Sequence, residues 1–355
     1  MRFSPIRGRA ACNNPHGRFA RTVSDTGEAY ADELPEISHD TQLLPETMRS
    51  IISRNASPDI NFRQSINPYR GCEHGCIYCY ARPAHAYVDL SPGLDFETRI
   101  FFKPDAASQL RRALARPGYR CQTIALGANT DAYQPAEREL RITRSILEVL
   151  AECRHPVAIV TKSALIERDL DVLQDLAANR LTRVMISVTT LDDELKRTME
   201  PRTASPSRRL KIIERLSSAG VPVGSMIAPV IPGLTDHELE RIVARVAAAG
   251  ADQAAYILLR LPHEVADLFK NWLEEHHPLR ARKVMSMIRQ LRSGQINDPC
   301  FGSHMSGRGN LAILLRDRFE KACRRHRLST GASPRLNTEA FRAPLDRHPQ
   351  LDLLD

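Results

Sequence analysis

The feature that most constrains the fold is a repeated unit, in which an apolar run of strand length precedes a stretch with helical spacing of apolar residues. The runs VAIV at 157–160 and AAYILL at 254–259 are apolar at every position rather than at alternate positions. Continuous apolar strands are expected where both faces of a parallel sheet are buried. Such units recur between residues 122 and 277, and the segment 62–71, taken as a first strand, brings the expected number to six.

Strict alternation of strands and helices leaves two architectures, an open doubly wound sheet or a barrel that can be incomplete. The 355 residues fit one barrel with extensions, because single hydrophobic cores stop growing near about 250 to 300 residues. We expect the repeated units to form a domain at 61–290. An irregular leader precedes it at 1–60, and a Gly-rich loop, a basic helix and a tail follow at 291–355.

Helix ends can be read at several places in the repeats. Gly220 and Gly250 follow two of the expected helices, where glycine suits a left-handed C-terminal cap. Thr235 precedes another helix, and Glu238 stands three residues later. This spacing predicts a capping box, in which the two side chains satisfy free amides of the first turn.

Polar residues stand where the expected strands end. In both architectures the carboxyl ends of the strands carry the chemistry. The residues concerned are Asn129, Thr130, Asp131, Thr161, Lys162, Ser163, Ser187, Thr189, Thr190, the stretch 229–233 and Arg260. Polar residues at strand ends also aid solubility, so one of them alone means little. Six consecutive strand ends of this kind indicate a shared polar mouth.

Three of the eight cysteines lie close together, at Cys72, Cys76 and Cys79 in the stretch CEHGCIYC. In a cytosolic chain of this size, a close group of cysteines indicates a metal or redox site rather than a disulfide framework. Single cysteines elsewhere are usually small hydrophobic residues. The spacing Cys-x3-Cys-x2-Cys is therefore the informative part, and it raises the question of why there are three thiols.

Three explanations are open. A structural zinc site normally needs four ligands, and the nearest candidates for the fourth are His74 and His85, although most such histidines are hydrogen-bonded surface residues. A cluster with four cysteine ligands would need a remote donor such as Cys121 or Cys153. A [4Fe-4S] cluster with one iron left open requires only three thiolates, just as a catalytic metal site keeps one position free.

The net charge and the lengths of the apolar runs limit the kinds of protein that this sequence can encode. Lys and Arg exceed Asp and Glu by 50 to 42, a net charge of +8, which fits either a solvated basic surface or a face that binds a polyanion. Basic residues gather at 111–120 and 316–327. No apolar run approaches the ~18 residues of a membrane span, and the N-terminus lacks the apolar centre of a secretory signal. We expect a cytoplasmic protein without a membrane anchor.

The cysteine motif, with the aromatic Tyr78 just before its third cysteine, resembles the signature of the radical SAM (S-adenosylmethionine) superfamily. Residues 62–290 are similar to the partial (βα)6 barrel of that superfamily. The stretches GANTDAYQPAE, TKSALIERD and MIAPVIPGLTD resemble its spore photoproduct lyase-like subgroup, often labelled DNA-repair-photolyase-like. SINPYRGCEHGCIYCYARPAHAY, SPGLDFE, SVTTLD, MEPR and LRLP resemble an uncharacterised branch of that subgroup.

This resemblance implies an enzyme with two cofactors. Cys72, Cys76 and Cys79 would bind the cluster, and the amino and carboxylate groups of SAM would complete its open iron. An electron from a flavodoxin- or ferredoxin-type reductant would then cleave SAM to a 5'-deoxyadenosyl radical. The first candidate substrate is a nucleic acid, and the alternatives are a protein or a small molecule. A non-catalytic module that binds iron or zinc is the alternative from a different class.

The resemblance also implies roles at the strand ends. Asn129, Thr130 and Asp131 would accept hydrogen bonds from the SAM ammonium, although Asp131 also suits a helix N-cap. Lys162 would pair with the SAM carboxylate, and Ser187 would bind the ribose or the carboxylate.

Other residues would shape the SAM site and the substrate site. Tyr78 would lie over the adenine or pack on the loop, and Val230 and Ile231 would give the adenine backbone groups and an apolar wall. Arg202 and Arg260 are candidate substrate contacts, because an arginine in an apolar run needs an anionic partner; Glu200 is the structural alternative for that partner.

Two further features qualify the resemblance. Ala128 stands where spore photoproduct lyase has a cysteine that returns a hydrogen atom to the product radical, so the resemblance does not extend to that reaction in its known form. The Gly-rich stretch 301–310 lacks the spacing of a phosphate-binding loop or a dinucleotide fingerprint. It would either cover the barrel mouth or contact nucleic acid.

Overall fold

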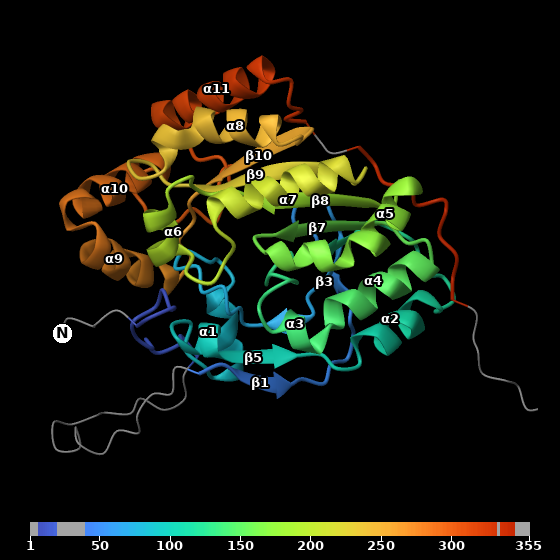
Figure 1. Cartoon of the computed structure of the whole chain (residues 1–355). Helices are drawn as coiled ribbons and strands as arrows, with labels where there is room; N and C mark the ends of the chain where they lie inside the picture. Colours follow the sequence, from blue (N-terminus) through green and yellow to red (C-terminus); the bar gives the residue numbers. More distant parts are fainter. Residues whose placement is uncertain (1–5, 20–39, 332–333, 345–355) are drawn as a thin grey trace, which may run out of the picture.

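The protein is described by a computed structural model covering residues 6–19, 40–331 and 334–344 (Figure 1). The parts of the expected leader and tail at 1–5, 20–39, 332–333 and 345–355 lie outside the described residues. No helix in the described ranges is both long enough and apolar enough to span a bilayer.

Six strands run parallel in a seven-stranded sheet of order β10-β9-β8-β7-β6-β3-β2. The parallel strands are β3 (Gln64–Ile66), β6 (Ile124–Leu126), β7 (Val157–Thr161), β8 (Thr182–Ser187), β9 (Val223–Val230) and β10 (Gln253–Leu258). The short β2 (Ser53–Arg54) pairs antiparallel with β3. All six predicted strands are confirmed. Neighbours in the sheet follow chain order, which is typical of a barrel rather than of a doubly wound sheet, whose strand order reverses at a switch point.

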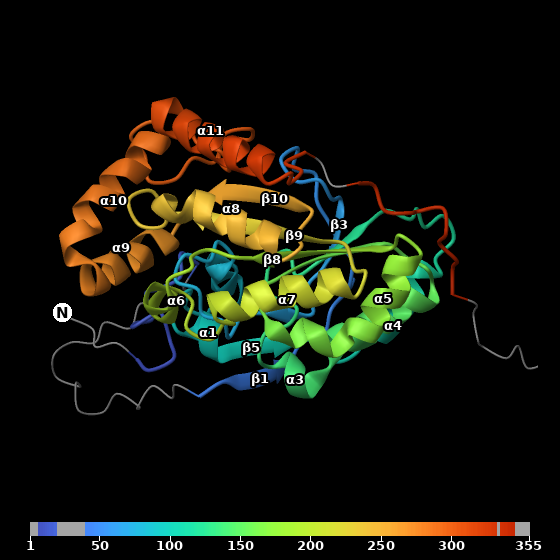
Figure 2. The ribbon, with the colours of Figure 1, turned by 45° about the horizontal axis from the view of Figure 1, so that its top comes forward.

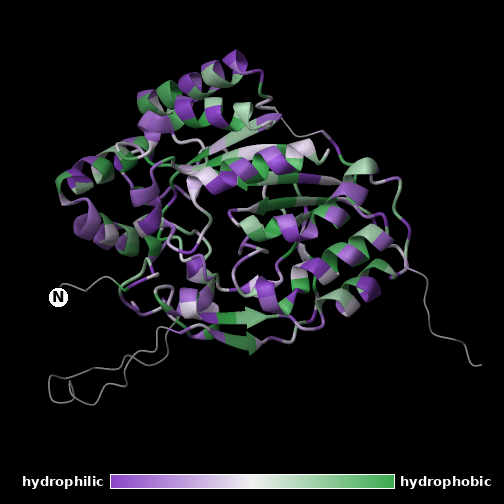
Figure 3. Cartoon of the chain, viewed as in Figure 1, coloured by the Kyte–Doolittle hydropathy of each residue, from purple (hydrophilic) through white to green (hydrophobic). Residues whose placement is uncertain are grey.

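Helices follow each parallel strand and cover the outer side of the sheet (Figures 1 and 2). In chain order, β3 is followed by α2 (Ala106–Leu114), and β6 is followed by α3 (Glu137–Leu140) with α4 (Ile142–Glu152). β7 is followed by η3 (Ala164–Asp169) with α5 (Leu170–Ala178). β8 is followed by α6 (Asp193–Met199) with α7 (Pro206–Ser218), and β9 by η4 (Asp236–Glu238) with α8 (Leu239–Ala248). Beyond β10 come α9 (Val265–His276), α10 (Pro278–Leu291) and α11 (Gly309–Arg325). Apolar residues of strands and inner helix faces form the core, and the outer helix faces are largely hydrophilic (Figure 3).

A second, three-stranded sheet of order β1-β5-β4 was not predicted. It consists of β1 (Gln42–Pro45), β5 (Arg99–Phe102) and β4 (Tyr69–Arg70). The cysteine loop leaves β4 and leads through η2 (Arg82–Val88) and α1 (Asp95–Thr98) into β5. The segment expected to be an irregular leader thus supplies β1 and β2. These strands are too short for an apolar pattern to reveal them.

Two predictions of helix ends have different outcomes. Gly220 and Gly250 have φ of +77° and +94° just after α7 and α8, so the glycine caps are confirmed. The capping box at Thr235 and Glu238 is wrong. The Thr235 hydroxyl accepts the amide of Ile231 at 2.9 Å, and the Glu238 carboxylate accepts the Thr190 hydroxyl. The side chains of Thr235 and Glu238 therefore bind groups outside the first turn of the helix, instead of the free amides within it.

The C-terminal loop lies on the end of β10. The Met305 carbonyl accepts the amide of Leu258 at 2.9 Å, and the buried Arg292 binds the carbonyls of Leu258 and Leu259 as well as those of loop residues 303 and 304. Asp59, between β2 and β3, accepts the amide of Gly302 at 2.8 Å. A loop contact therefore bridges the two ends of the open barrel, which no strand pair closes in the described part of the chain.

Candidate functional site

The three cysteines lie on one tight loop at the mouth of the barrel. Successive backbone turns shape it, from the Gly75 amide to the Cys72 carbonyl and from the Cys79 amide to the Cys76 carbonyl, both at 3.2 Å. All three thiols are free. Burial raises the pKa of Cys76 to about 12, and it also raises the pKa of Cys72 and of Cys79. The thiols are therefore protonated at neutral pH until a metal displaces their protons.

A buried arginine holds this loop in shape. Arg82 is completely buried, and its guanidinium donates to the carbonyls of Gly75 at 3.0 Å and Cys76 at 2.9 Å. It also pairs with Glu97 at 2.5 Å, whose carboxylate accepts the amides of Ala10 and Ala11 from the N-terminal segment. The loop is thus preorganised by fixed polar contacts.

Glu200 connects the cysteine loop to the barrel wall. The Tyr78 hydroxyl donates to the Glu200 carboxylate, which also accepts the Thr189 hydroxyl at 2.8 Å and pairs with Arg209. A backbone bond from the amide of Ile77 to the carbonyl of Met199, at 3.1 Å, runs alongside. Burial alone would raise the pKa of Glu200, but the charges of Arg209 and Lys162 and the hydrogen bonds outweigh it and hold this pKa at about 2.

These contacts correct one expectation. The partner of Glu200 is Arg209, so Glu200 does not pair with Arg202 or Arg260. Arg202 instead lies 3.4 Å from Glu73, beside the cysteine loop. The Glu200–Arg209 pair could not be predicted from the sequence, because nine residues separate its members and both stand outside the strand ends.

A second contact joins the cysteine loop to the ends of β6 and β7. His74 Nδ1 lies 3.2 Å from Asp131 Oδ2. The Asp131 carboxylate also accepts the Thr161 hydroxyl at 2.7 Å, the Lys162 amide at 2.8 Å and the Tyr133 amide at 2.9 Å. Burial would raise the pKa of Asp131, yet His74 and these hydrogen bonds lower it to about 2. Asp131 is therefore a carboxylate whose acceptor positions are all used within the protein.

The expectation that His74 and His85 are surface residues is wrong, because both are buried. Nε2 of His85 lies 3.0 Å from the Arg99 carbonyl. Burial lowers the pKa of His85 to about 4. Its ring packs edge-on against Phe96, on the outer side of the cysteine loop.

The other predicted SAM contacts lie at neighbouring strand ends. Asn129 is exposed, and its backbone amide donates to the side-chain oxygen of Asn67. The Thr130 hydroxyl donates to the Tyr69 carbonyl at 2.8 Å. The Lys162 ammonium lies 5.8 Å from the centre of the Tyr78 ring. It has no hydrogen bond to any residue that the structure describes, and its charge lowers the pKa of Cys76 against the effect of burial.

Ser187, Val230 and Ile231 are buried at the ends of β8 and β9. The Ser187 carbonyl accepts Arg209 at 3.0 Å. Ile231 belongs to the same apolar cluster as Cys76 and Tyr78. The structure thus brings the cysteine loop together with the ends of β7, β8 and β9, as the sequence analysis expected.

Tyr80 is a mouth residue that the sequence analysis missed. It follows Cys79 directly, exposes 51% of its surface and donates its hydroxyl to the Ala128 carbonyl at the end of β6. Burial nevertheless raises the pKa of Tyr80 to about 12. Tyr80 is therefore a half-exposed ring at the mouth, held there by its hydroxyl.

The basic stretches do not form one face. Residues 111–120 begin in α2, which packs against α4, whereas 316–327 fall largely in α11, which packs against α8 (Figures 1 and 2). Arg318 of α11 is paired with Glu240 at 2.7 Å. Net charge alone therefore does not define a surface for a polyanion.

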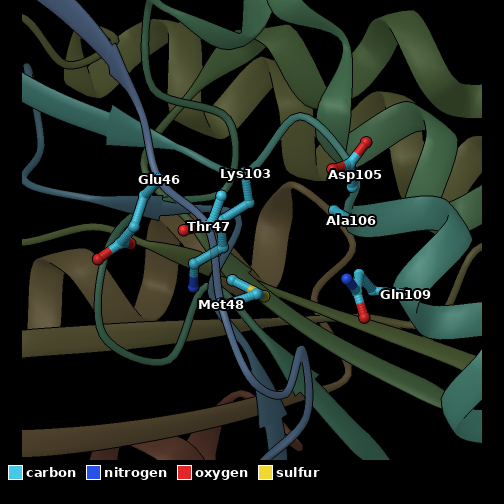
Figure 4. Close-up of a pocket in the computed structure, with 7 residues that line it drawn as sticks. All are labelled: Glu46, Thr47, Met48, Lys103, Asp105, Ala106 and Gln109. Atoms are coloured by element: carbon cyan, nitrogen blue, oxygen red, sulfur yellow. The ribbon is translucent and has the colours of Figure 1, made fainter.

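Two hollows lie away from the cysteines. A cavity of about 60 Å³ lies between β1 and α2, lined by Glu46, Thr47, Met48, Lys103, Asp105, Ala106 and Gln109 (Figure 4). A surface pocket of about 420 Å³ is lined by Gly233, Asp236, His237, Arg280, Lys283 and Met287. The first contains none of the residues expected at the mouth, and the second contains only Gly233, the last residue of the stretch 229–233.

The loop fits a cluster with three protein ligands. Among the described residues, no group of three His, Cys, Asp or Glu side chains is arranged to hold a single metal ion. A [4Fe-4S] cluster makes a different demand, because each thiolate binds a different iron. Cys72 and Cys79 contact the apolar Ala81 and Phe96, and a dry shell of this kind surrounds such clusters in proteins. Three free thiols on a preorganised loop, two of them buried and one partly buried, therefore match the donor set.

Comparison with known proteins agrees with this geometry. The family model of the radical SAM superfamily matches residues 66–246. An uncharacterized protein of Mycobacterium bovis is 36% identical over 288 residues, which are 80% of this chain and 81% of that protein. An uncharacterized protein of Methanocaldococcus jannaschii is 26% identical over 214 residues, 60% of this chain and 76% of that protein.

Solved structures show the same fold. Spore photoproduct lyase complexed with dinucleoside spore photoproduct superimposes with a TM-score of 0.57 at 17% identity, over 80% of this chain and 79% of that chain. A mutant of that lyase with bound AdoMet (SAM) and the dinucleoside gives a TM-score of 0.55 over the same shares. With the family match, the relative at 36% identity and the cysteine loop at the mouth of six parallel strands, this chain belongs to the radical SAM superfamily of enzymes.

Proposed function

We propose that Cys72, Cys76 and Cys79 hold a [4Fe-4S] cluster, and that the protein cleaves SAM reductively to start radical chemistry on a nucleic acid. The observation that carries this proposal is one loop with three free thiols, of which Cys72 and Cys76 are buried and Cys79 is partly buried. When bound, the cluster supplies the electron that breaks SAM into methionine and a 5'-deoxyadenosyl radical. The protein's own residues hold the reactants and exclude water.

The strand ends would position SAM. Lys162, whose ammonium makes no hydrogen bond or ion pair with a described residue, pairs with the SAM carboxylate. Asn129 and Thr130 accept from the SAM ammonium, since the Asp131 carboxylate is already filled by internal donors. In this proposal Asp131 positions His74 and the backbone of Lys162 instead. Ser187 contacts the ribose or carboxylate.

The ring of Tyr78 and the wall of Val230 and Ile231 would enclose the adenine. All three residues are buried, and Tyr78 and Ile231 belong to the same apolar cluster as Cys76. The Tyr78 hydroxyl is bound to Glu200, so only the ring is available to SAM. A flavodoxin- or ferredoxin-type protein would deliver the electron.

The proposed substrate class is supported by structural similarity to spore photoproduct lyase, and not by the net charge of the chain. Spore photoproduct lyase, which shares the fold, has been solved with a dinucleoside spore photoproduct. Ala128 cannot donate a hydrogen atom as a cysteine can, so the reaction proposed here differs from that lyase in its final hydrogen transfer. A protein or a small molecule is the alternative substrate.

The test is anaerobic reconstitution with iron and sulfide, followed by reduction in the presence of SAM. We expect an absorbing cluster and the formation of 5'-deoxyadenosine, measured by mass spectrometry. Replacement of Cys72, Cys76 or Cys79 by Ala should abolish both. Cys300→Ala is the matched control, because Cys300 is exposed. Tightly held zinc, or iron that leaves SAM intact, would instead identify a non-catalytic metal-binding module.

A further inference from the structure

Arg260, at the carboxyl end of β10, has a guanidinium group without an acceptor. The side chain is partly buried, and its Nε is buried with no hydrogen-bond partner. Within the described residues, its terminal nitrogens make no hydrogen bond or ion pair either. Burial lowers the pKa of Arg260. A charged group in this position is costly unless an anion completes its hydrogen bonds.

Three other buried arginines have acceptors for their terminal nitrogens, although Nε of Arg292, like that of Arg260, has no partner among the described residues. Arg82 binds four carbonyls and Glu97, Arg209 binds Glu200 and Thr203, and Arg292 binds four carbonyls. The nearby acid Asp59 does not serve Arg260, because its oxygens accept the Gly302 amide and His304. The contrast indicates that the partner of Arg260 is not part of the protein.

Tyr80, which directly follows Cys79, stands at the same mouth as this guanidinium, and the charge of Arg260 lowers the pKa of Tyr80 against the effect of burial. The hydroxyl of Tyr80 is fixed to the Ala128 carbonyl at the end of β6, which leaves about half of the side chain accessible. Arg260 follows the last parallel strand and Ala128 follows the second. The pair therefore spans the side of the mouth where the barrel is open.

We propose that Arg260 and Tyr80 form a nucleotide subsite, in which Arg260 binds a backbone phosphate and Tyr80 stacks on the adjoining base. The inference rests on the proposed function and names the substrate contact within it. A planar guanidinium matches the oxygens of a phosphodiester. Aromatic rings beside basic side chains hold unpaired bases in proteins that bind single strands. The basic stretches of α2 and α11 are not needed for this contact.

The test measures binding of a fluorescein-labelled oligothymidylate to the reconstituted protein by fluorescence anisotropy, across a series of potassium chloride concentrations. Arg260→Gln should weaken binding by on the order of tenfold. It should also reduce the slope of log K against log salt by about 0.7, the amount expected for one phosphate contact to a single strand. Tyr80→Leu should weaken binding on the order of tenfold, through lost stacking, with the slope unchanged.

Two matched controls isolate the phosphate contact. Arg112→Gln removes the same charge from an exposed position on α2 and should leave the affinity unchanged. A methylphosphonate oligothymidylate has the same bases on an uncharged backbone, so wild type and Arg260→Gln should bind it equally. Melting temperatures would show that Arg260→Gln is folded, as expected for a side chain without internal partners.

The inference is overturned if Arg260→Gln binds the oligothymidylate with the affinity and salt slope of wild type. It is also overturned if the mutation weakens binding to the methylphosphonate as much as to the phosphodiester. SAM cleavage without substrate is measured in parallel. A protein that forms 5'-deoxyadenosine but fails the binding test refutes the subsite alone, whereas one that forms no 5'-deoxyadenosine refutes the proposed function whatever it binds.

Discussion

The Tyr78 hydroxyl donates a hydrogen bond to the carboxylate of Glu200, 122 residues further along the chain. Tyr78 belongs to the cysteine loop, and Glu200 follows α6. Glu200 is also the counter-charge of the buried Arg209. One carboxylate therefore neutralises an arginine inside the barrel and anchors the loop that carries the thiols.

Removing this anchor should destabilise the protein without any change to a cysteine. Tyr78→Phe deletes one hydrogen bond to a buried charge, and we expect the free energy of unfolding to fall by about 2 kcal/mol. Glu200→Gln leaves Arg209 without its counter-charge and should cost about 3 kcal/mol or more. Urea denaturation of the metal-free protein, followed by circular dichroism, measures both.

Tyr87→Phe is the control for this pair, since Tyr87 is 69% exposed and its loss of a hydroxyl should change stability by less than about 0.5 kcal/mol. Equal midpoints for Tyr78→Phe and wild type would show that the bond to Glu200 contributes nothing.

The fold could largely be predicted from the sequence, and the reason is periodicity. Each parallel strand is a continuous apolar run, and the helix after it has a different spacing. β1 and β4 carry no such pattern, because four and two residues are too few to show one. Thr235 and Glu238 had the local spacing of a capping box, but Thr190, distant in sequence, binds Glu238 instead.

The site could be predicted only where spacing encodes chemistry. Three thiols in eight residues indicate a metal on their own. Arg82 and Glu97 could not be found in this way, since the value of each depends on carbonyls and amides that only the folded loop brings together. Arg260 could be suspected from its apolar neighbours, but its missing partner is visible only in three dimensions.

The turn at Gly75 should not tolerate a side chain. Gly75 has φ of +63°, and an added Cβ would lie 2.5 Å from Glu97 Oε2. Glu97 cannot move freely, because Arg82 and two backbone amides hold it. Gly75→Ala should therefore lower the free energy of unfolding by about 1 to 2 kcal/mol from backbone strain and by about 1 to 3 kcal/mol more from crowding.

Gly118→Ala separates the two effects, because Gly118 has φ of +77° and nothing within 4 Å of an added Cβ. It should show the strain alone and should keep full iron content after reconstitution. The prediction fails if the two alanine variants lose the same stability and bind the same iron.

Lys162 should determine the affinity for SAM and should not affect the binding of the cluster. Lys162→Met removes the only ionic contact that we propose for the SAM carboxylate, so the dissociation constant for SAM should rise on the order of tenfold. Iron content should stay at the wild-type value, since the thiols are unchanged. Isothermal titration of the reconstituted, oxidised protein with SAM measures the affinity.

Lys283→Met is the control, because Lys283 is exposed on α10. The charge of Lys162 also acts on Glu200, so a purely structural role is the competing account. In that case Lys162→Met would lower the melting temperature and leave the affinity for SAM intact.

Acid should destabilise the metal-free protein before its carboxylates titrate, because of buried histidines. His155 is completely buried, with Nε2 at 2.9 Å from the Tyr119 hydroxyl and Nδ1 at 3.0 Å from the Pro156 carbonyl. Burial lowers its pKa to about 4, whereas an unfolded chain has a histidine pKa of about 6.5. Between these values the unfolded state binds a proton that the folded state does not.

The histidine contribution to the free energy of unfolding should therefore be constant above about pH 7 and should fall as the pH drops from about 6.5 toward 4. Each such histidine contributes a slope of about 1.4 kcal/mol per pH unit. His155→Gln removes one titrating group, so the slope in urea denaturation between these pH values should decrease by about that amount, whatever the variant does to stability at neutral pH.

His326→Gln alters an exposed histidine and should leave the slope unchanged. If His155→Gln keeps the wild-type slope, His155 is protonated equally in the folded and unfolded states, and its burial is not the cause of acid sensitivity.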